Sequence, residues 1–328
     1  MKKVSFSWKP TISGREHWRW GLFMVVASRS GRSTRIRIMV RGLVIWILSL
    51  AMGAYLILTT AWFMMLSQRA TNYVTWEDCV LAPLRWEEIK HKRGDAYIAE
   101  GIIALENRKW SDAMLKLQTG LAHSPGNWRG RRNLGLFYLA ADRRPQGLQL
   151  LVDGFTPQYQ GRDAMELVMQ TTLAAKSYDL ALAALETSLT HRGGAVERDR
   201  EWLVDQKCCV LMMAQRYEDA LDWIDGASRM TEIRFESKAV ALIELNRFDE
   251  ARDVLDKWGE GSGVMGGVQR ISVRLAREAG DVAAMRAVLR EMVERNPLDP
   301  APRVYAVVQE YLIGEKTAAR VALEAYLM

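Results

Sequence analysis

The chain has few of the residues that build disulfide frameworks or metal sites. Among its 328 residues are only three cysteines and four histidines. Two of the cysteines, Cys208 and Cys209, are adjacent, and neighbouring cysteines rarely bridge each other. The histidines show no ligand spacing; they are His17, His91, His123 and His191. We therefore expect no metal site, no cofactor and no disulfide framework, and we expect Cys208 to be a small buried packing residue.

Catalytic sequence motifs are also absent. The chain contains no G-x-x-x-x-G-K-[ST], no H-E-x-x-H and no C-x-x-C. A G-x-G-x-x-G occurs at 261–266, but a dinucleotide cradle needs a strand before it and a helix after it. The segment before it, DEARDVLDKW, has a helical pattern instead. We predict a flexible turn there, no catalytic residue, and a protein that is not an enzyme.

What the chain does contain is a repeat of about 34 residues. An aromatic or long residue is followed, three positions later, by a small one, and this pair recurs along the sequence. The pairs are Trp110–Ala113, Arg144–Gly147, Tyr178–Ala181, Tyr217–Ala220, Phe248–Ala251, Val282–Met285 and Lys316–Ala319. Two helices of roughly 12 to 15 residues with short turns fill such a repeat, and each pair exposes an apolar face that only a neighbouring pair covers.

In these features the sequence resembles the tetratricopeptide repeat family. Leu134, Gly135 and Tyr138 match the family's Leu-Gly pair and its Tyr, and Pro125 falls where the family has a closing proline. The resemblance implies an all-α fold, a helix-pair solenoid of about seven repeats over residues 94–328. The expected repeats are 94–127, 128–161, 162–195, 201–234, 232–265, 266–299 and 300–328.

Three positions depart from the family pattern. Met285 stands where a small residue is expected, and Arg144 and Lys316 replace the aromatic residue. We expect these helices to pack less regularly.

One long apolar segment precedes the repeats. Residues 42–68 contain no charged residue and are bounded by Arg41 and Arg69. About 20 apolar residues cross the hydrocarbon core of a bilayer, so this segment is predicted to be a single transmembrane helix. A cleaved signal peptide is the alternative, but the 41 residues before the segment are too long for an ordinary n-region.

Charge predicts the orientation of this helix. Residues 1–41 hold ten lysines and arginines against one acid, Glu16, whereas Arg69 and Arg85 are the nearest cations on the other side. By the positive-inside rule, residues 1–41 form a basic cytoplasmic tail and the repeats lie outside the cytoplasmic membrane. The chain has no N-x-[ST] acceptor site, which favours a bacterial inner-membrane protein with a periplasmic repeat domain.

The same charge distribution argues against a nucleic-acid partner. Without residues 1–69 the chain keeps 34 basic and 38 acidic residues, so the repeat domain is slightly acidic despite the overall charge of +6. The basic excess lies beside the membrane helix, where topology and anionic lipid explain it.

Two segments flank the membrane helix. Residues 17–27, which include Trp18 and Trp20, are too short to span and are expected in the interface. Residues 69–93 are expected to form a juxtamembrane stalk whose Trp86 and Ile89 cap the apolar end of the solenoid. The alternative is a docking segment for a membrane partner.

One charged constellation is a candidate binding site. Arg270, Arg274 and Arg277 recur at i, i+4 and i+7, which is one stripe of a helix. The family's register implies that this stripe faces the binding groove, as do Arg129 and Arg132 in the second repeat. The groove would take an acidic peptide segment or a C-terminal carboxylate. A solvated face paired with Glu278 and Asp281 is the alternative, and the apolar lining around Tyr305, Val308 and Tyr311 is a second candidate surface.

Two classes of function are compatible with these features. The first is a membrane-anchored interaction scaffold or assembly factor. The second is an accessory subunit of an envelope enzyme, secretion or polysaccharide-export complex whose catalysis lies in another chain.

Overall fold

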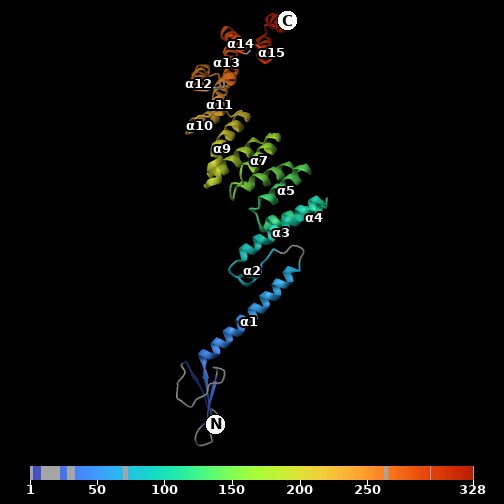
Figure 1. Ribbon diagram of the computed structural model, residues 1–328, viewed down its shortest axis with the longest axis vertical. Helices are drawn as coiled ribbons and strands as arrows, with labels where there is room; N and C mark the ends of the chain where they lie inside the picture. The colour runs from blue at the N-terminus through green and yellow to red at the C-terminus, as the bar shows by residue number, and fades with distance from the viewer. Residues whose placement is uncertain are drawn as a thin grey trace. The chain divides into compact units, whose positions relative to one another are not determined.

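The computed structural model describes residues 3–8, 23–27, 34–68, 73–261, 265–295 and 297–327 (Figure 1). The chain forms two compact units, residues 1–134 and residues 135–328. The first unit contains a small sheet, a long apolar helix and the first repeat, and the second unit contains most of the remaining helix pairs.

A three-stranded sheet lies in the basic tail. Its strands are β1 (Lys3–Ser7), β2 (Phe23–Ala27) and β3 (Thr34–Met39), in the order β1-β3-β2. β3 pairs parallel with β1 and antiparallel with β2. We did not predict these strands, although Ile36 and Ile38 alternate with arginines in β3, as strand residues do. Of the segment expected in the membrane interface, residues 23–27 form β2, and residues 17–22 lie outside the described residues.

The long apolar segment forms one continuous helix, α1 (Val40–Ser67). Its most apolar window has a mean hydropathy of 2.1, and it is the one helix of the described residues that is long and apolar enough to cross a membrane. Its apolar side chains are mostly exposed, as with Ile47, Leu50 and Ile57.

The segment after α1 folds back onto it. Helix α2 (Trp76–Val80) begins with a capping box between Thr75 and Asp78, and a turn leads into α3 (Trp86–Glu106). A small core joins the end of α1 to this segment; its buried members are Leu66, Val74, Cys79, Ala82 and Ile89. Ile89, which we expected to cap the solenoid, thus packs with residues of α1, and Trp86 stays half exposed.

Fourteen consecutive helices of the described residues form seven pairs, so the predicted helix-pair solenoid is confirmed. In chain order the pairs are α3 with α4 (Trp110–His123), α5 (Trp128–Ala140) with α6 (Arg144–Val152), α7 (Arg162–Ala174) with α8 (Tyr178–Thr190), α9 (Gly194–Met213) with α10 (Tyr217–Asp225), α11 (Glu232–Glu244) with α12 (Phe248–Gly261), α13 (Met265–Glu278) with α14 (Val282–Arg295), and α15 (Pro300–Leu312) with α16 (Lys316–Leu327). A short 3-10 helix, Asp153–Phe155, follows α6.

Each second helix begins at the aromatic or long residue on which the repeats align, from Trp110 to Lys316. The one long spacing is explained by α9, which has 20 residues, so the insertion lengthens a helix instead of a loop. Of the glycine-rich run, α12 ends at Gly261 and α13 begins at Met265, while residues 262–264 lie outside the described residues.

The small residues are buried where the two helices of a pair cross. Ala113, Ala181, Ala220 and Ala251 have no exposed surface. Met285, the exception, is also fully buried and packs with Leu289 and Met292. The positions without an aromatic residue, Arg144 and Lys316, are exposed.

Glycine is required where helices approach most closely. A Cβ at Gly147 would lie 2.8 Å from the carbonyl oxygen of Gly135, which is too close for any side chain. Gly147, the small residue of the second repeat, is therefore a packing requirement between α5 and α6.

All seven turns within the pairs share one backbone geometry. The residue two positions before each second helix has a positive φ, between 53° and 85°. These residues are Arg108, Asp142, Lys176, Gln215, Asn246, Gly280 and Gly314. The next residue donates its N–H to the carbonyl five residues earlier, as Lys109 does to Ala104 at 2.9 Å. This is the Schellman pattern, and it closes the first helix of every pair.

Candidate partner-binding surface

In the second unit the first helices of neighbouring pairs form a row. Helices α9, α11 and α13 contact one another in sequence. Hydrogen bonds continue the row from α13 to α15, through Arg277 to Gln309 and through Tyr305 to Arg270. Stacked helix pairs use such a row of like helices as an extended binding surface.

The predicted arginine stripe lies on this row, on α13. Arg270 is exposed, and no ion pair of its side chain is found among the described residues. Arg274 forms an ion pair with Glu244 of α11. Arg277 donates to Gln309 of α15 at 2.8 Å and to Glu278 at 2.7 Å.

Tyr305 of α15 lies beside all three arginines. Its hydroxyl donates to the backbone carbonyl of Arg270 at 3.4 Å. Burial raises the pKa of the Tyr305 phenol, and the nearby charges of Arg277, Arg270 and Arg274 oppose that rise. The four side chains therefore form one cluster, which we call the arginine cluster.

Neighbouring groups of this fold partly neutralise the cluster. Glu244 and Glu278 pair with two of its three guanidinium groups, and the predicted partner Asp281 instead caps α14 by accepting from Ala284 N–H at 2.9 Å. Arg270 is thus the arginine best placed to meet a ligand, since its guanidinium needs no exchange of partners.

Arg129 and Arg132 belong to α5 in the first unit. Both are exposed, and the Arg129 carbonyl accepts from the side chain of Asn133 at 2.8 Å. They stay a prediction separate from the arginine cluster.

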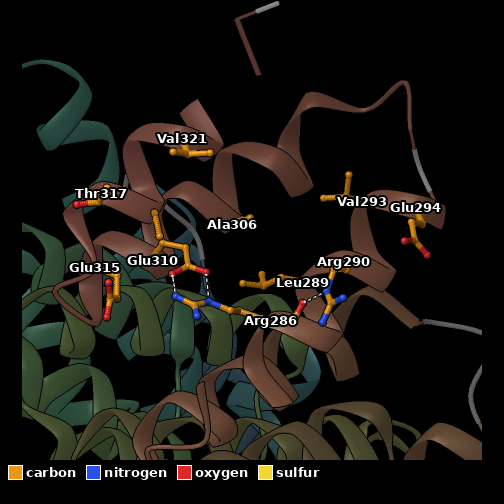
Figure 2. A pocket seen from close by; sticks show the side chains of 11 residues that line it. Arg286, Leu289, Arg290, Val293, Glu294, Ala306, Glu310, Glu315, Thr317 and Val321 are labelled. Carbon is orange, nitrogen blue, oxygen red and sulfur yellow. Dashed lines mark hydrogen bonds and ion pairs between the residues drawn. The ribbon is translucent and has the colours of Figure 1, made fainter. Parts of the chain in front are cut away.

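A cavity that we did not predict lies between the last helices (Figure 2). It has a volume of about 740 Å³ and is bounded by α14, α15 and α16. Leu289, Val293, Ala306 and Val321 supply apolar walls. The lining residues come from three separate helices, each of which also contributes residues to other surfaces. The periodicity within a single helix therefore did not predict the cavity.

One ion pair lies at the base of this cavity. Figure 2 shows the Arg286 guanidinium facing the Glu310 carboxylate in a fork, with N–O distances of 2.7 and 2.8 Å. Glu310 is buried, and its two hydrogen bonds with Arg286 raise the pKa of Arg286. The ion pair therefore joins α14 to α15.

The alternative apolar surface on α15 is exposed in part. Val308 and Tyr311 are 46% and 60% exposed, and Val304 and Leu312 extend the same surface. Tyr305 is half buried in the arginine cluster instead. Apolar and basic groups thus lie side by side on α15 and α13.

The described residues contain no group of three or more His, Cys, Asp or Glu side chains placed to hold a metal ion. Cys208 is fully buried, as expected of a packing residue, and burial raises the pKa of its thiol. His191 hydrogen-bonds the carbonyl of Phe155 at 2.7 Å, and the His123 ring stacks on Tyr97. Cys208, His191 and His123 thus make packing or hydrogen-bond contacts within the fold.

No family model matches the sequence, and no curated protein matches it. Solved structures similar to the chain include a tetratricopeptide repeat protein from Parabacteroides merdae, at 12% identity over 72% of this chain and 92% of that one, with a TM-score of 0.42. PilF of Pseudomonas aeruginosa is 14% identical over 66% and 98% of the two chains, with a TM-score of 0.36. YrrB, a TPR protein described as having an unusual peptide-binding site, is 13% identical over 62% and 98%, with a TM-score of 0.35. At these identities the likeness concerns the fold alone.

Proposed function

We propose that this chain, a helix-pair protein of the tetratricopeptide repeat type, is a membrane-anchored scaffold that holds a protein partner outside the cytoplasmic membrane. The observation that carries the proposal is the combination, in one chain, of the exposed apolar helix α1 with seven consecutive helix pairs. Helix-pair solenoids present extended surfaces to other proteins, and an apolar helix of this length suits a bilayer.

The proposed topology has the basic tail in the cytoplasm and the repeats in the periplasm. The ten basic residues before α1, against the few just after it, support this orientation. The proposed division is a tail over 1–41, a membrane helix over 42–68, a juxtamembrane segment over 69–93 and the solenoid over 94–328.

The proposed binding surface is the arginine cluster with the adjoining apolar surface of α15. Arg270 offers a free guanidinium, and Val308 and Tyr311 offer exposed apolar area. An acidic peptide segment or a C-terminal carboxylate with apolar neighbours would match this combination. Arg129 and Arg132 are proposed as a second contact of the same kind.

Topology is tested by fusing alkaline phosphatase, which is active only in the periplasm, to the C-terminus. The fusion is expected to be active, and a cytoplasmic reporter at the same position is expected to be inactive. The reverse pattern would place the repeats in the cytosol and contradict the proposed function.

The second candidate function is an accessory subunit whose catalysis lies in another chain. Copurification after mild detergent extraction distinguishes the two candidate functions. A translocon component or chaperone as the stoichiometric partner supports the scaffold, whereas a polymerase or synthase complex supports the accessory subunit.

A further inference from the structure

The turn between α2 and α3 lies beside α1. The hydroxyl of Tyr55 donates to the carbonyl of Val80 at 2.6 Å, and the indole N–H of Trp76 donates to the hydroxyl of Thr60 at 3.2 Å. Tyr55 precedes the end of α1 by about 18 Å, at a rise of 1.5 Å per residue. The chain therefore leaves α1, turns, and returns along its last three turns.

The tip of this return is apolar. Residues 79–84 read CVLAPL and contain no charge, and Asp78 and Arg85 bound them. We call this segment the apolar tip. Leu84 is 84% exposed, and the flanking Trp76 and Trp86 are 44% and 52% exposed. Within the segment Pro83 and Leu84 are exposed, while Cys79 and Ala82 are buried. An exposed apolar turn between two tryptophans is the pattern of a segment that lies in a membrane interface.

The backbone of the apolar tip is mostly satisfied within the fold. The N–H groups of Leu84 and Arg85 both donate to the carbonyl of Leu81, at 2.8 and 2.9 Å, and Leu81 N–H donates to Glu77. Pro83 has no N–H, and the Val80 carbonyl is bonded to Tyr55. A non-helical segment at membrane depth needs such internal hydrogen bonds, because lipid offers none to the backbone.

The charges nearest to the tip are paired. The buried carboxylate of Asp78 lies 2.6 Å from the ammonium group of Lys92, and Arg85 pairs with Glu88 at 3.9 Å. These pairs lower the cost of bringing this end of α2 close to lipid.

A cavity of about 720 Å³ separates the tip from α1. One helical face of α1, made by Tyr55, Leu58, Thr59 and Trp62, forms one wall, and the turn with Ala82 and Pro83 forms the other. Leu58 is 69% exposed, so the cavity is continuous with the exposed apolar surface of α1.

The expected membrane depth of α1 places the cavity among acyl chains. With Arg41 at the inner boundary, the roughly 20 residues that cross the hydrocarbon core end near Trp62. Tyr55 then lies about 10 Å inside the outer boundary.

We propose that residues 79–84 insert into the outer leaflet beside α1 and that the cavity between them holds an acyl chain of a membrane phospholipid. The proposal rests on the proposed function in two respects, the membrane location of α1 and its orientation. It assigns the juxtamembrane segment a lipid surface as its partner, in place of the cap for the solenoid.

The test uses the full chain in vesicles of phosphatidylethanolamine and phosphatidylglycerol that contain a phospholipid with a photoreactive diazirine in one acyl chain. After illumination, labelled residues are mapped by mass spectrometry. Labels are expected on α1 and on the apolar tip, and only at background level on Leu298, which is as exposed as Leu84 but lies in the turn between α14 and α15. Labelling of α1 without labelling of the tip overturns this proposal and leaves the anchor intact. Absence of label from α1 as well contradicts the anchor itself.

Two variants and a matched control test the proposal further. Leu84→Glu changes an exposed side chain without altering packing, and it is expected to lower labelling of the tip about fivefold, because a carboxylate is costly in hydrocarbon. Leu298→Glu is the matched control and is expected to leave the labelling of the tip unchanged. Ala82→Trp fills the cavity and is expected to remove the label from Thr59, which is buried, whereas Leu58 is 69% exposed and keeps its label from the surrounding lipid. Unchanged labelling of the tip in Leu84→Glu, or protection of the whole Tyr55–Trp62 face by a second copy of the chain, overturns the proposal.

Discussion

The guanidinium of Arg234 on α11 lies 2.7 Å from the carboxylate of Asp205 on α9, and both side chains are buried. Arg234 also donates to the carboxylate of Glu201 at 2.9 Å and to the backbone carbonyl of Arg229. Thr231, the N-cap of α11, donates to Asp205 at 3.0 Å. This buried network joins the first helices of two neighbouring repeats.

Replacing Arg234 should therefore destabilise the protein strongly. Arg234→Met leaves Asp205 buried without its cation and is expected to cost about 3 to 5 kcal/mol in the free energy of unfolding. Chemical denaturation monitored by circular dichroism measures the loss. The control is Arg247→Met, which removes an exposed pair with Glu250 and should cost less than about 1 kcal/mol. An equal loss in the free energy of unfolding in the two variants would show that burial of the network adds nothing to stability.

The helix crossings are tested by two alanines of α8. Ala181 is fully buried and Ala183, two residues later, is exposed. Ala181→Trp overpacks the crossing and should lower the free energy of unfolding by about 1 to 3 kcal/mol or more, whereas Ala183→Trp should leave it nearly unchanged. Tolerance of tryptophan at both positions would refute the packing role of the small residue.

Sequence periodicity predicted the helix pairs, and in the structure the residue on which the repeats align begins each second helix. It worked because each mark depends on neighbours within one repeat: Tyr217 begins α10, and Ala220 is buried one turn later. The strands of the tail were missed because the charge of that segment dominated its interpretation, although Ile36 and Ile38 alternate correctly.

Contacts between distant residues account for the rest of what the sequence did not reveal. Tyr55 meets Val80 across 25 positions, Arg274 meets Glu244 across 30, and Arg277 meets Gln309 across 32. No local pattern encodes such partners. The spacing of the three arginines could be read from the sequence, but the ion pair between Arg274 and Glu244 could not.

The shared turn geometry predicts that glycine stabilises some turns. Gln215 is exposed and has a φ of 59°, a conformation that costs a residue with a side chain roughly 1 kcal/mol. Gln215→Gly should raise the free energy of unfolding by about 0.5 to 1 kcal/mol. Ala214→Gly, at the adjacent C-cap of α9, whose backbone has helical φ and ψ, should lower it. Thermal melts of the two variants should shift in opposite directions; shifts of the same sign would contradict the strain argument.

The pair between Asp78 and Lys92 predicts a dependence on pH. Burial alone would raise the pKa of Asp78, but hydrogen bonds from Lys92 and Thr75 lower it to about 2 from 3.8. A pKa lowered in the folded state stabilises the fold above pH 3.8, and this contribution is lost as the pH falls towards 2. Asp78→Asn should therefore cost about 2 kcal/mol at pH 7, and the difference from the parent should shrink between pH 4 and pH 2. Thermal melts in detergent at these pH values measure it; a constant difference would contradict the assignment.

The scaffold proposal depends most on whether the arginine cluster binds a partner. Arg270, Arg274 and Arg277 are replaced together by alanine in the full chain, and Arg192, Arg198 and Arg252, which are exposed elsewhere in the second unit, form the matched control. The ion pairs that the cluster variant loses are partly exposed and contribute about 0 to 1 kcal/mol each, so helicity should stay unchanged in both variants and the melting temperature should fall only slightly.

The decisive measurement is the affinity of each variant for the copurifying partner, in mild detergent, at low and at physiological salt. The account predicts that the cluster variant binds about tenfold more weakly than the parent at low salt, that its remaining affinity depends less on salt, and that Arg270→Ala alone produces most of the loss. Equal affinity of the parent, the cluster variant and the control variant at low salt would contradict it, and the arginine cluster would then be a solvated face of the solenoid.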